Sequence, residues 1–386
     1  MLVLVEELAK KVKWLSQTAP VVQFAADGSM SAVSDEVSAT VSAPSASAEV
    51  PDADGDKSFC GAPVRGRKKK PVPPVMADEK PAFVNARKLL SLLKLYAKHK
   101  TVELVQDEGR LSIGAVGVYP LTTVSEGEST PYPFQAPEGD SFTLPCADLR
   151  RYIDSVSFAA SKDGTRPMLC GVRIVRDGDN MMAVATDIYR LMVYGADLVY
   201  IGGVTIPQGV PRSKILGMDG DATITDGVNT ICVEVGAYKV IADSAGLYPN
   251  LEKVIPAIDP LAAHIVLSRE SIDAWAAACR HMLAAENTNH HRANIDTVDG
   301  AIGLAFETGD DGKRKGQSLT YTIPAAQCPA GSKSAVNAKY MLDMLSRCDA
   351  DTLNLQITEE LGPLRFDWVA KSGIACKYIL MPMQSM

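Results

Sequence analysis

The sequence predicts an α+β fold built from three tandem domains with antiparallel sheets. The chain has 386 residues, which is more than one ordinary hydrophobic core holds. Short apolar segments that alternate with period two are interleaved with amphipathic helical stretches, a pattern typical of mixed α+β domains. Two layouts of these elements alternate along the chain, so we expect six half-units in domains at 1–140, 141–260 and 261–386.

The first layout is a short apolar strand followed by an amphipathic helix. It occurs at 1–15, 142–158 and 265–282. The second layout adds a strand with period-two alternation, a turn and another strand after the helix, and it occurs at 82–114, 205–236 and 334–368. One helix is therefore expected in each half-unit, at 6–17, 85–98, 147–158, 211–218, 269–282 and 337–348.

Residues 42–80 depart from these layouts. The segment is rich in Ala, Ser, Pro and charge and includes the basic run 65–70. Such a composition is typical of an exposed, flexible insertion in the first domain. The basic run is interpreted as part of a solvated loop, with DNA contact or a targeting signal as the alternatives.

The composition restricts the class of protein. No run of 18 apolar residues occurs, so no membrane-spanning segment is expected. The apolar start is followed by acidic residues without a small-residue cleavage site, unlike a signal peptide. The 8 cysteines are scattered without a CxxC pair, which favours a reducing cytoplasm over a disulfide framework.

The positive charge of the chain gathers on the predicted helices. Together they carry a net charge of +8, whereas the whole chain carries −7. Arg87, Lys94 and Lys98 fall on one stripe of the second helix. For one helix a solvated face would explain such a stripe, but six helices of positive sum favour a surface that faces phosphates without reading sequence.

Thr186, Asp187 and Arg190 interrupt the apolar run VATDIYRLMV at 184–193. An enzyme site would need a partner base, and the chain has neither a G-x-S-x-G motif nor a P-loop. We expect Thr186 and Asp187 to bond to nearby backbone at a strand end. The chain is therefore not expected to be an enzyme or to hold a cofactor.

A metal site is the remaining chemical alternative. Its candidates are Cys279, His281, His290 and His291. Their spacing fits no zinc motif, and residues two apart on a helix point to different faces. We therefore expect no metal.

Five segments point to a known family. SFTLPCADLRRYIDSVSFAAS (141–161) is similar to the opening of its middle domain, and TRPMLCGV (165–172) to its R-P-x-L-x-G-V segment. The run at 184–193 resembles V-A-T-D-G-H-R-L-A-V, GLYPNLEKVIP (246–256) resembles G-x-Y-P-x-Y-x-x-V-I-P, and YILMPM (378–383) resembles Y-x-x-M-P-M. In this order they resemble the bacterial DNA polymerase III beta subunit, the beta sliding clamp family. The match is weaker in the first domain.

The resemblance implies a ring-forming processivity factor for DNA replication. Each of three clamp domains would place two sheets outside and two helices inside, and a head-to-tail homodimer would encircle duplex DNA. The implied partners are double-stranded DNA, the replicative polymerase and an ATP-dependent clamp loader. The alternative is a clamp-like interaction scaffold that does not encircle DNA. The expected DNA-facing residues are Lys10, Lys13, Arg87, Lys88, Lys94, Lys98, Arg150, Arg151, Arg212, Lys214, Arg280 and Lys339.

The resemblance also implies a groove for partner peptides between the second and third domains. Its wall would comprise Arg166, Leu169, Thr186, Tyr189, Arg190, Leu191, Pro249, Val254, Ile379, Met381, Pro382 and Met383. Met, Leu and Pro suit a slot for apolar anchors, and Arg166 and Arg190 are expected to donate at its rim. Ile188 and Tyr189 replace the family's usual Gly-His pair, and Gln384 stands where Arg is common. These departures leave the peptide preference open.

Overall fold

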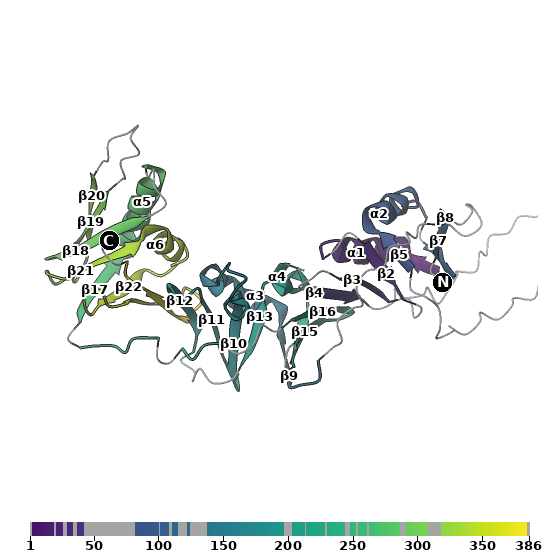
Figure 1. Cartoon of the computed structure of the whole chain (residues 1–386), viewed down its shortest axis with the longest axis horizontal. Coiled ribbons are helices and arrows are strands. Elements are labelled where there is room, and N and C mark those ends of the chain that lie inside the picture. Colours follow the sequence, from purple (N-terminus) through teal and green to yellow (C-terminus); the bar gives the residue numbers. More distant parts are fainter. Residues whose placement is uncertain are drawn as a thin grey trace, which may run out of the picture. The chain divides into compact units, whose positions relative to one another are not determined.

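The computed structural model describes most of the chain outside 42–81. The described residues are 2–18, 21–25, 29–33, 37–41, 82–99, 101–107, 110–114, 122–123, 137–196, 203–212, 214–227, 230–243, 248–251, 254–260, 262–285, 291–307 and 318–383. The predicted insertion and Gln384 lie outside them. These residues form two compact units, Met1–Cys146 with Gly209–Asp243, and Ala147–Gln208 with Ser244–Met386 (Figure 1).

Unit 1 contains two antiparallel sheets and the helices α1 (Val5–Leu15), α2 (Ala86–Leu95) and α4 (Gly209–Arg212). Its four-stranded sheet has the order β1 (Leu2–Leu4), β6 (Thr101–Asp107), β7 (Arg110–Gly114) and β8 (Thr122–Thr123). Its eight-stranded sheet has the order β5 (Ala82–Asn85), β2 (Val21–Phe24), β3 (Met30–Val33), β4 (Val37–Val41), β16 (Tyr238–Asp243), β15 (Thr230–Val235), β14 (Asp221–Asp226) and β9 (Ser141–Pro145).

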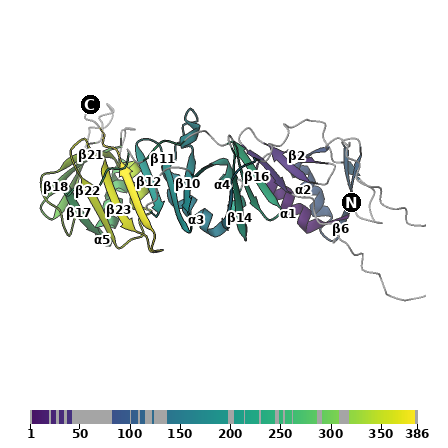
Figure 2. The same cartoon turned by 90° about the horizontal axis from the view of Figure 1, so that it is seen from below.

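Unit 2 repeats this plan with α3 (Cys146–Val156), α5 (Arg269–Ala285) and α6 (Ala338–Leu345). Its eight-stranded sheet, seen in Figure 2, has the order β13 (Val204–Pro207), β10 (Gly171–Asp177), β11 (Asn180–Thr186), β12 (Arg190–Gly195), β24 (Ala375–Leu380), β23 (Leu364–Val369), β22 (Thr352–Ile357) and β17 (Ala263–Ser268). Its four-stranded sheet has the order β20 (Ser318–Pro324), β19 (Ala301–Glu307), β18 (Arg292–Val298) and β21 (Lys333–Asn337).

The strand pairing confirms the internal repeat. In each predicted domain the first strand of one half-unit pairs within the sheet of the other half-unit, as β9 does with β14 and β13 with β10. The pairs β16–β4 and β12–β24 cross the predicted boundaries near 140 and 260. Strand pairing therefore joins each half of the predicted second domain to a neighbour, and the three-domain division stays a prediction.

Two helices, α2 and α6, begin after a residue whose side chain satisfies free backbone amides. Asn85 precedes α2, and its side-chain oxygen accepts from the amides of Arg87 and Lys88 at 3.1 and 3.2 Å. Asn337 caps α6 in the same way, at 3.0 and 3.3 Å. These caps satisfy amides that have no partner inside the helix.

The predicted helix at 211–218 is wrong. The structure has the short α4, then Lys214 in the left-handed region with φ 60°, and then a 3-10 helix at Ile215–Gly217. A residue with left-handed backbone ends the helical hydrogen-bond ladder, so one continuous helix cannot form there.

The cores lie between helices and sheets. In unit 1 Leu8, Leu89 and Phe24 are fully buried, and α1 and α2 lie side by side (Figure 1). In unit 2 Trp275 of α5 packs against Phe366 of β23. Each helix thus has one buried face, and its other face is free for function.

Candidate functional site

The turn between β11 and β12 holds the polar residues of the run at 184–193. Asp187 Oδ1 accepts from the amides of Tyr189 and Arg190 at 3.1 and 3.0 Å. The Thr186 hydroxyl donates to the carbonyl of Arg190 at 2.7 Å and accepts from the amide of Ile188 at 3.1 Å. The prediction that Thr186 and Asp187 bond to local backbone is confirmed.

Arg190 ties this turn to two other elements. Its Nε donates to Asp187 Oδ2 at 3.0 Å, its Nη1 to Asp343 Oδ2 of α6 at 2.7 Å, and its Nη2 to the carbonyl of Phe158 at 2.7 Å. The guanidinium lies 4.1 Å from the centre of the Tyr340 ring. The side chain is 7% exposed, so the expectation that Arg190 donates at a groove rim is wrong.

Two opposing influences act on the pKa of Arg190. Burial alone would lower it, but the hydrogen bond to Asp343 and the nearby carboxylates of Asp187 and Asp343 raise the pKa above its ordinary value. The guanidinium therefore stays charged, and its role is to hold the turn against α6.

Beside the turn lies a compact apolar cluster on β12 and β24. Leu191 faces Ile379 across these strands, and both are buried against Leu251, with Tyr248 and Ile255 packed on the outside. Four predicted wall residues, Leu191, Ile379, Thr186 and Leu169, are buried, whereas Pro249 and Arg166 are exposed.

Two apolar side chains of the predicted groove face solvent. Val254 is 44% exposed and Met381 is 39% exposed. The amide of Met381 donates to the carbonyl of Tyr189 at 2.8 Å. The segment that follows β24 is therefore bonded directly to the β11–β12 turn. The structure thus brings Tyr189, Leu191, Ile379 and Met381 together.

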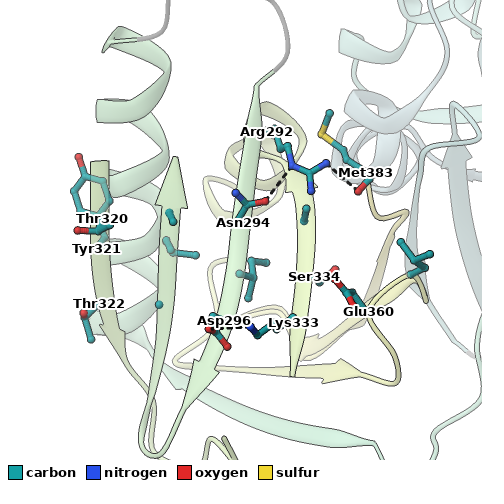
Figure 3. A pocket seen from close by; sticks show the side chains of 16 residues that line it. Arg292, Asn294, Asp296, Thr320, Tyr321, Thr322, Lys333, Ser334, Glu360 and Met383 are labelled. Carbon is teal, nitrogen blue, oxygen red and sulfur yellow. Dashed lines mark hydrogen bonds and ion pairs between the residues drawn. The ribbon is translucent and has the colours of Figure 1, made fainter. Parts of the chain in front are cut away.

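Met383 is held by a different sheet. Its carbonyl accepts from Arg292 Nη1 at 3.3 Å, and its amide donates to the carbonyl of Ala335 at 2.7 Å. Figure 3 shows the Arg292 guanidinium between Asn294 and Met383, at one end of a hollow of about 450 Å³ over β18–β21. Pro382, which is half-buried, links this residue to Met381.

The two residues that depart from the family pattern are conspicuous on the turn. Ile188 has φ 74°, a conformation that costs a β-branched residue about 1–3 kcal/mol. Burial does not offset this strain, because Ile188 is 47% exposed and Tyr189 is 58% exposed. Glycine would adopt this backbone freely.

The predicted DNA-facing side chains are exposed wherever the structure describes them. The side chain of Arg212 lies outside the described part. In unit 1 Lys10, Lys13, Lys94 and Lys98 line a hollow of about 990 Å³ between α1 and α2. The ammonium group of Lys10 forms an ion pair with Glu6 at 2.8 Å, and the neighbouring carboxylate weakens the attraction of Lys10 for an anionic ligand.

The structure bears on the candidate metal ligands Cys279, His281, His290 and His291 and on the question of a membrane-spanning helix. Within the described ranges no group of three His, Cys, Asp or Glu could hold a metal. Cys279 is buried in α5, and burial raises the pKa of its thiol to about 12. His281 is hydrogen-bonded to Tyr321, and His290 lies outside the described residues. In the part of the chain that is described, no helix is both long and apolar enough to span a membrane.

Several residues of the turn's surroundings were not foreseen from the sequence. Asp343, Tyr340 and Phe158 contact Arg190 from positions 32 or more residues away along the chain. The internal repeat predicted the helices that carry these residues. It did not predict which of their side chains contact the β11–β12 turn.

Comparisons with known proteins agree with this architecture. The family model for the DNA polymerase III beta subunit, central domain, matches residues 143–246. The beta sliding clamp of Treponema pallidum is 27% identical over 283 residues, which span 69% of this chain and 71% of the relative. The beta sliding clamp of Synechocystis sp. is 24% identical over 310 residues, 70% of this chain and 75% of the relative.

The fold comparison extends over the whole length. The crystal structure of the DNA polymerase sliding clamp from Pseudomonas aeruginosa with ligand has a TM-score of 0.75 at 18% identity, covering 100% of this chain and 99% of that one. The likeness at this identity concerns the fold, and the resemblance in sequence comes from the relatives above. The chain therefore resembles the beta sliding clamps in sequence over about 70% of its length, matches the central domain of the DNA polymerase III beta subunit at 143–246, and shares the clamp fold.

Proposed function

We propose that this protein is a DNA sliding clamp that closes into a ring around duplex DNA and tethers the replicative polymerase and other partners. It would act without catalysis in the cytoplasm, loaded by an ATP-dependent clamp loader. The observation that carries the proposal is the order of the strands at the sheet edges. The similarity to the beta sliding clamps supports it independently.

Each junction within the chain follows one rule. The predicted domains hold the strands β1–β8, β9–β16 and β17–β24. The fourth strand of one domain pairs with the eighth strand of the next domain, as in β4–β16 and β12–β24. Under this rule, the fourth strand of the third predicted domain, β20, and the eighth strand of the first, β8, are left without such a partner in the described sheets. Both are edge strands in the described sheets, and edge strands offer unpaired backbone groups to another chain. A β20–β8 pair between copies would close a head-to-tail ring.

The strand rule supports a head-to-tail assembly and leaves the number of copies open. Six predicted helices per chain permit a dimer or a trimer, and the family resemblance favours the homodimer. The exposed basic side chains of the helices, in a chain of net charge −7, would face phosphates inside the ring.

The topological mechanism is tested by loading the protein with its loader onto circular DNA and then cutting the DNA. We expect retention on the circle and loss after linearisation, since weak sequence-independent contacts do not hold a ring on an open end. Equal retention on circular and linear DNA contradicts encirclement and favours the scaffold alternative.

The partner groove is proposed at the apolar cluster of Leu191, Ile379 and Leu251. Val254, whose amide is bonded to the Leu251 carbonyl, and Met381, which follows β24, would supply its exposed apolar side chains. The matched test compares Val254→Ala with Val298→Ala, since Val298 is 46% exposed on β18. Val254→Ala should weaken binding of a polymerase-derived peptide several-fold, because a Val-to-Ala change removes apolar contact area, and Val298→Ala should not. Equal affinities for the two variants would place the groove elsewhere.

A further inference from the structure

Another hollow, lined in part by the β11–β12 turn, lies entirely within unit 2. It has a volume of about 610 Å³ and lies between the segment 157–163 and α6. Five basic and three acidic side chains line it, and we call it the basic hollow: Lys162, Arg166, Arg190, Lys339, Arg347, Asp163, Asp187 and Asp343.

The acidic side chains of the basic hollow are already engaged. Asp187 and Asp343 accept from buried Arg190 at 3.0 and 2.7 Å. Asp163 accepts from the amide and hydroxyl of Thr165 at 3.0 and 2.7 Å. The carboxylates of Asp187, Asp343 and Asp163 thus each accept hydrogen bonds from nearby groups of the same unit.

Four basic side chains remain turned to the hollow and exposed: Lys162, Arg166, Lys339 and Arg347. In the described part of the chain neither Lys162 nor Lys339 forms an ion pair. The guanidinium of Arg347 lies 4.4 Å from the centre of the Phe158 ring and bonds to the carbonyl of Asp343, which orients it. The five basic and three acidic side chains of the hollow sum to +2, so it is positive in a chain of net charge −7.

The basic hollow shares a wall with the proposed groove. Ile188 and Tyr189 line the hollow, and the carbonyl of Tyr189 accepts from the amide of Met381 on the groove side. An extended peptide seated over Met381 thus needs only to pass the exposed Ile188–Tyr189 turn to reach the four cations.

We propose that the basic hollow is a second docking subsite that receives acidic residues flanking the apolar anchors of a partner peptide. This inference rests on the proposed function of the adjacent groove. Arg and Lys form charge-assisted hydrogen bonds with carboxylates, and charge complementarity at a rim selects partners and speeds association. Lys339 is also among the residues expected to face DNA. A peptide is nevertheless favoured over nucleic acid, because Ile188 and Tyr189 line the hollow and the Tyr189 carbonyl is bonded to Met381 of the apolar groove.

The experiment uses the full chain and two synthetic peptides with the same Leu and Phe anchors. One carries three Asp residues beside the anchors, and its twin carries Asn at those positions. We expect the Asp peptide to bind at least about fivefold more tightly at low salt, and the difference to shrink as salt screens it. Lys162→Glu and Lys339→Glu should each remove most of the preference, whereas Lys371→Glu, an exposed lysine away from the hollow, should retain it.

The outcomes separate this inference from the groove itself. If both peptides bind equally and Val254→Ala weakens both, the acidic subsite is refuted and the groove stands. If neither peptide binds, the groove fails and the subsite with it. If a single-stranded oligonucleotide binds more tightly than the Asp peptide and loses affinity in Lys162→Glu, the hollow is a nucleic-acid site and the peptide proposal is overturned.

Discussion

Replacing Arg190 with methionine removes the side chain that joins the β11–β12 turn to the 3-10 helix Ser157–Ala159 region and to α6. Methionine keeps an unbranched aliphatic stem, so the change isolates the guanidinium together with its contact with the Tyr340 ring at 4.1 Å. Three hydrogen bonds are lost, at 3.0, 2.7 and 2.7 Å, to Asp187, Asp343 and Phe158.

The magnitude follows from what those partners do without the guanidinium. Breaking a buried charge pair costs about 3–5 kcal/mol, because the remaining charge stays buried without a partner. The Asp187 side chain is 13% exposed, whereas that of Asp343 is 35% exposed and regains water. We therefore place the loss at the lower end, about 3 kcal/mol of the free energy of unfolding of unit 2, or a fall in Tm of roughly 6–12 °C.

The measurement is thermal and urea unfolding of the full chain followed by circular dichroism. Arg280→Met on α5 is the matched control, since Arg280 is exposed and its replacement should stay within about 0.5 kcal/mol. A loss below about 1 kcal/mol for Arg190→Met would refute the assignment of Arg190 as the link between the turn and α6.

Three further predictions follow from individual contacts. Ile188→Gly should leave stability unchanged or raise it by about 1 kcal/mol in urea unfolding, because it relieves the strain at φ 74°; a clear loss would contradict that strain. Burial raises the thiol pKa values of Cys232, Cys279 and Cys376 to about 11, 12 and 12. These thiols should resist labelling at pH 8 until the protein unfolds, and their contribution to stability, full below pH 9, should be lost as pH rises toward 12. Finally, Arg365→Met should lower stability by about 2–3 kcal/mol and speed proteolysis near 254–260, because Arg365 bonds to Asp367 and the Pro256 carbonyl; unchanged proteolysis would contradict this role.

The α+β class, the internal repeat and the resemblance to the beta sliding clamps were all predictable from the sequence. Apolar periodicity is a local property, so the strand and helix positions of each half-unit could be read without tertiary contacts, and repetition made the reading stronger. Local chemistry also sufficed for the backbone contacts of the β11–β12 turn, because the backbone partners of Thr186 and Asp187 lie within four residues. The helix predicted at 211–218 failed at Lys214, whose left-handed backbone leaves no periodic signal.

Only the tertiary structure decided what the remaining polar residues do. Arg190 was expected at a groove rim, but it is buried against Asp343, which lies 153 residues away along the chain. The four cations of the basic hollow come from two segments, 162–166 and 339–347, that the alignment of β12 with β24 brings together. Such meetings depend on sheet register between distant strands, and residue spacing within either segment does not encode that register.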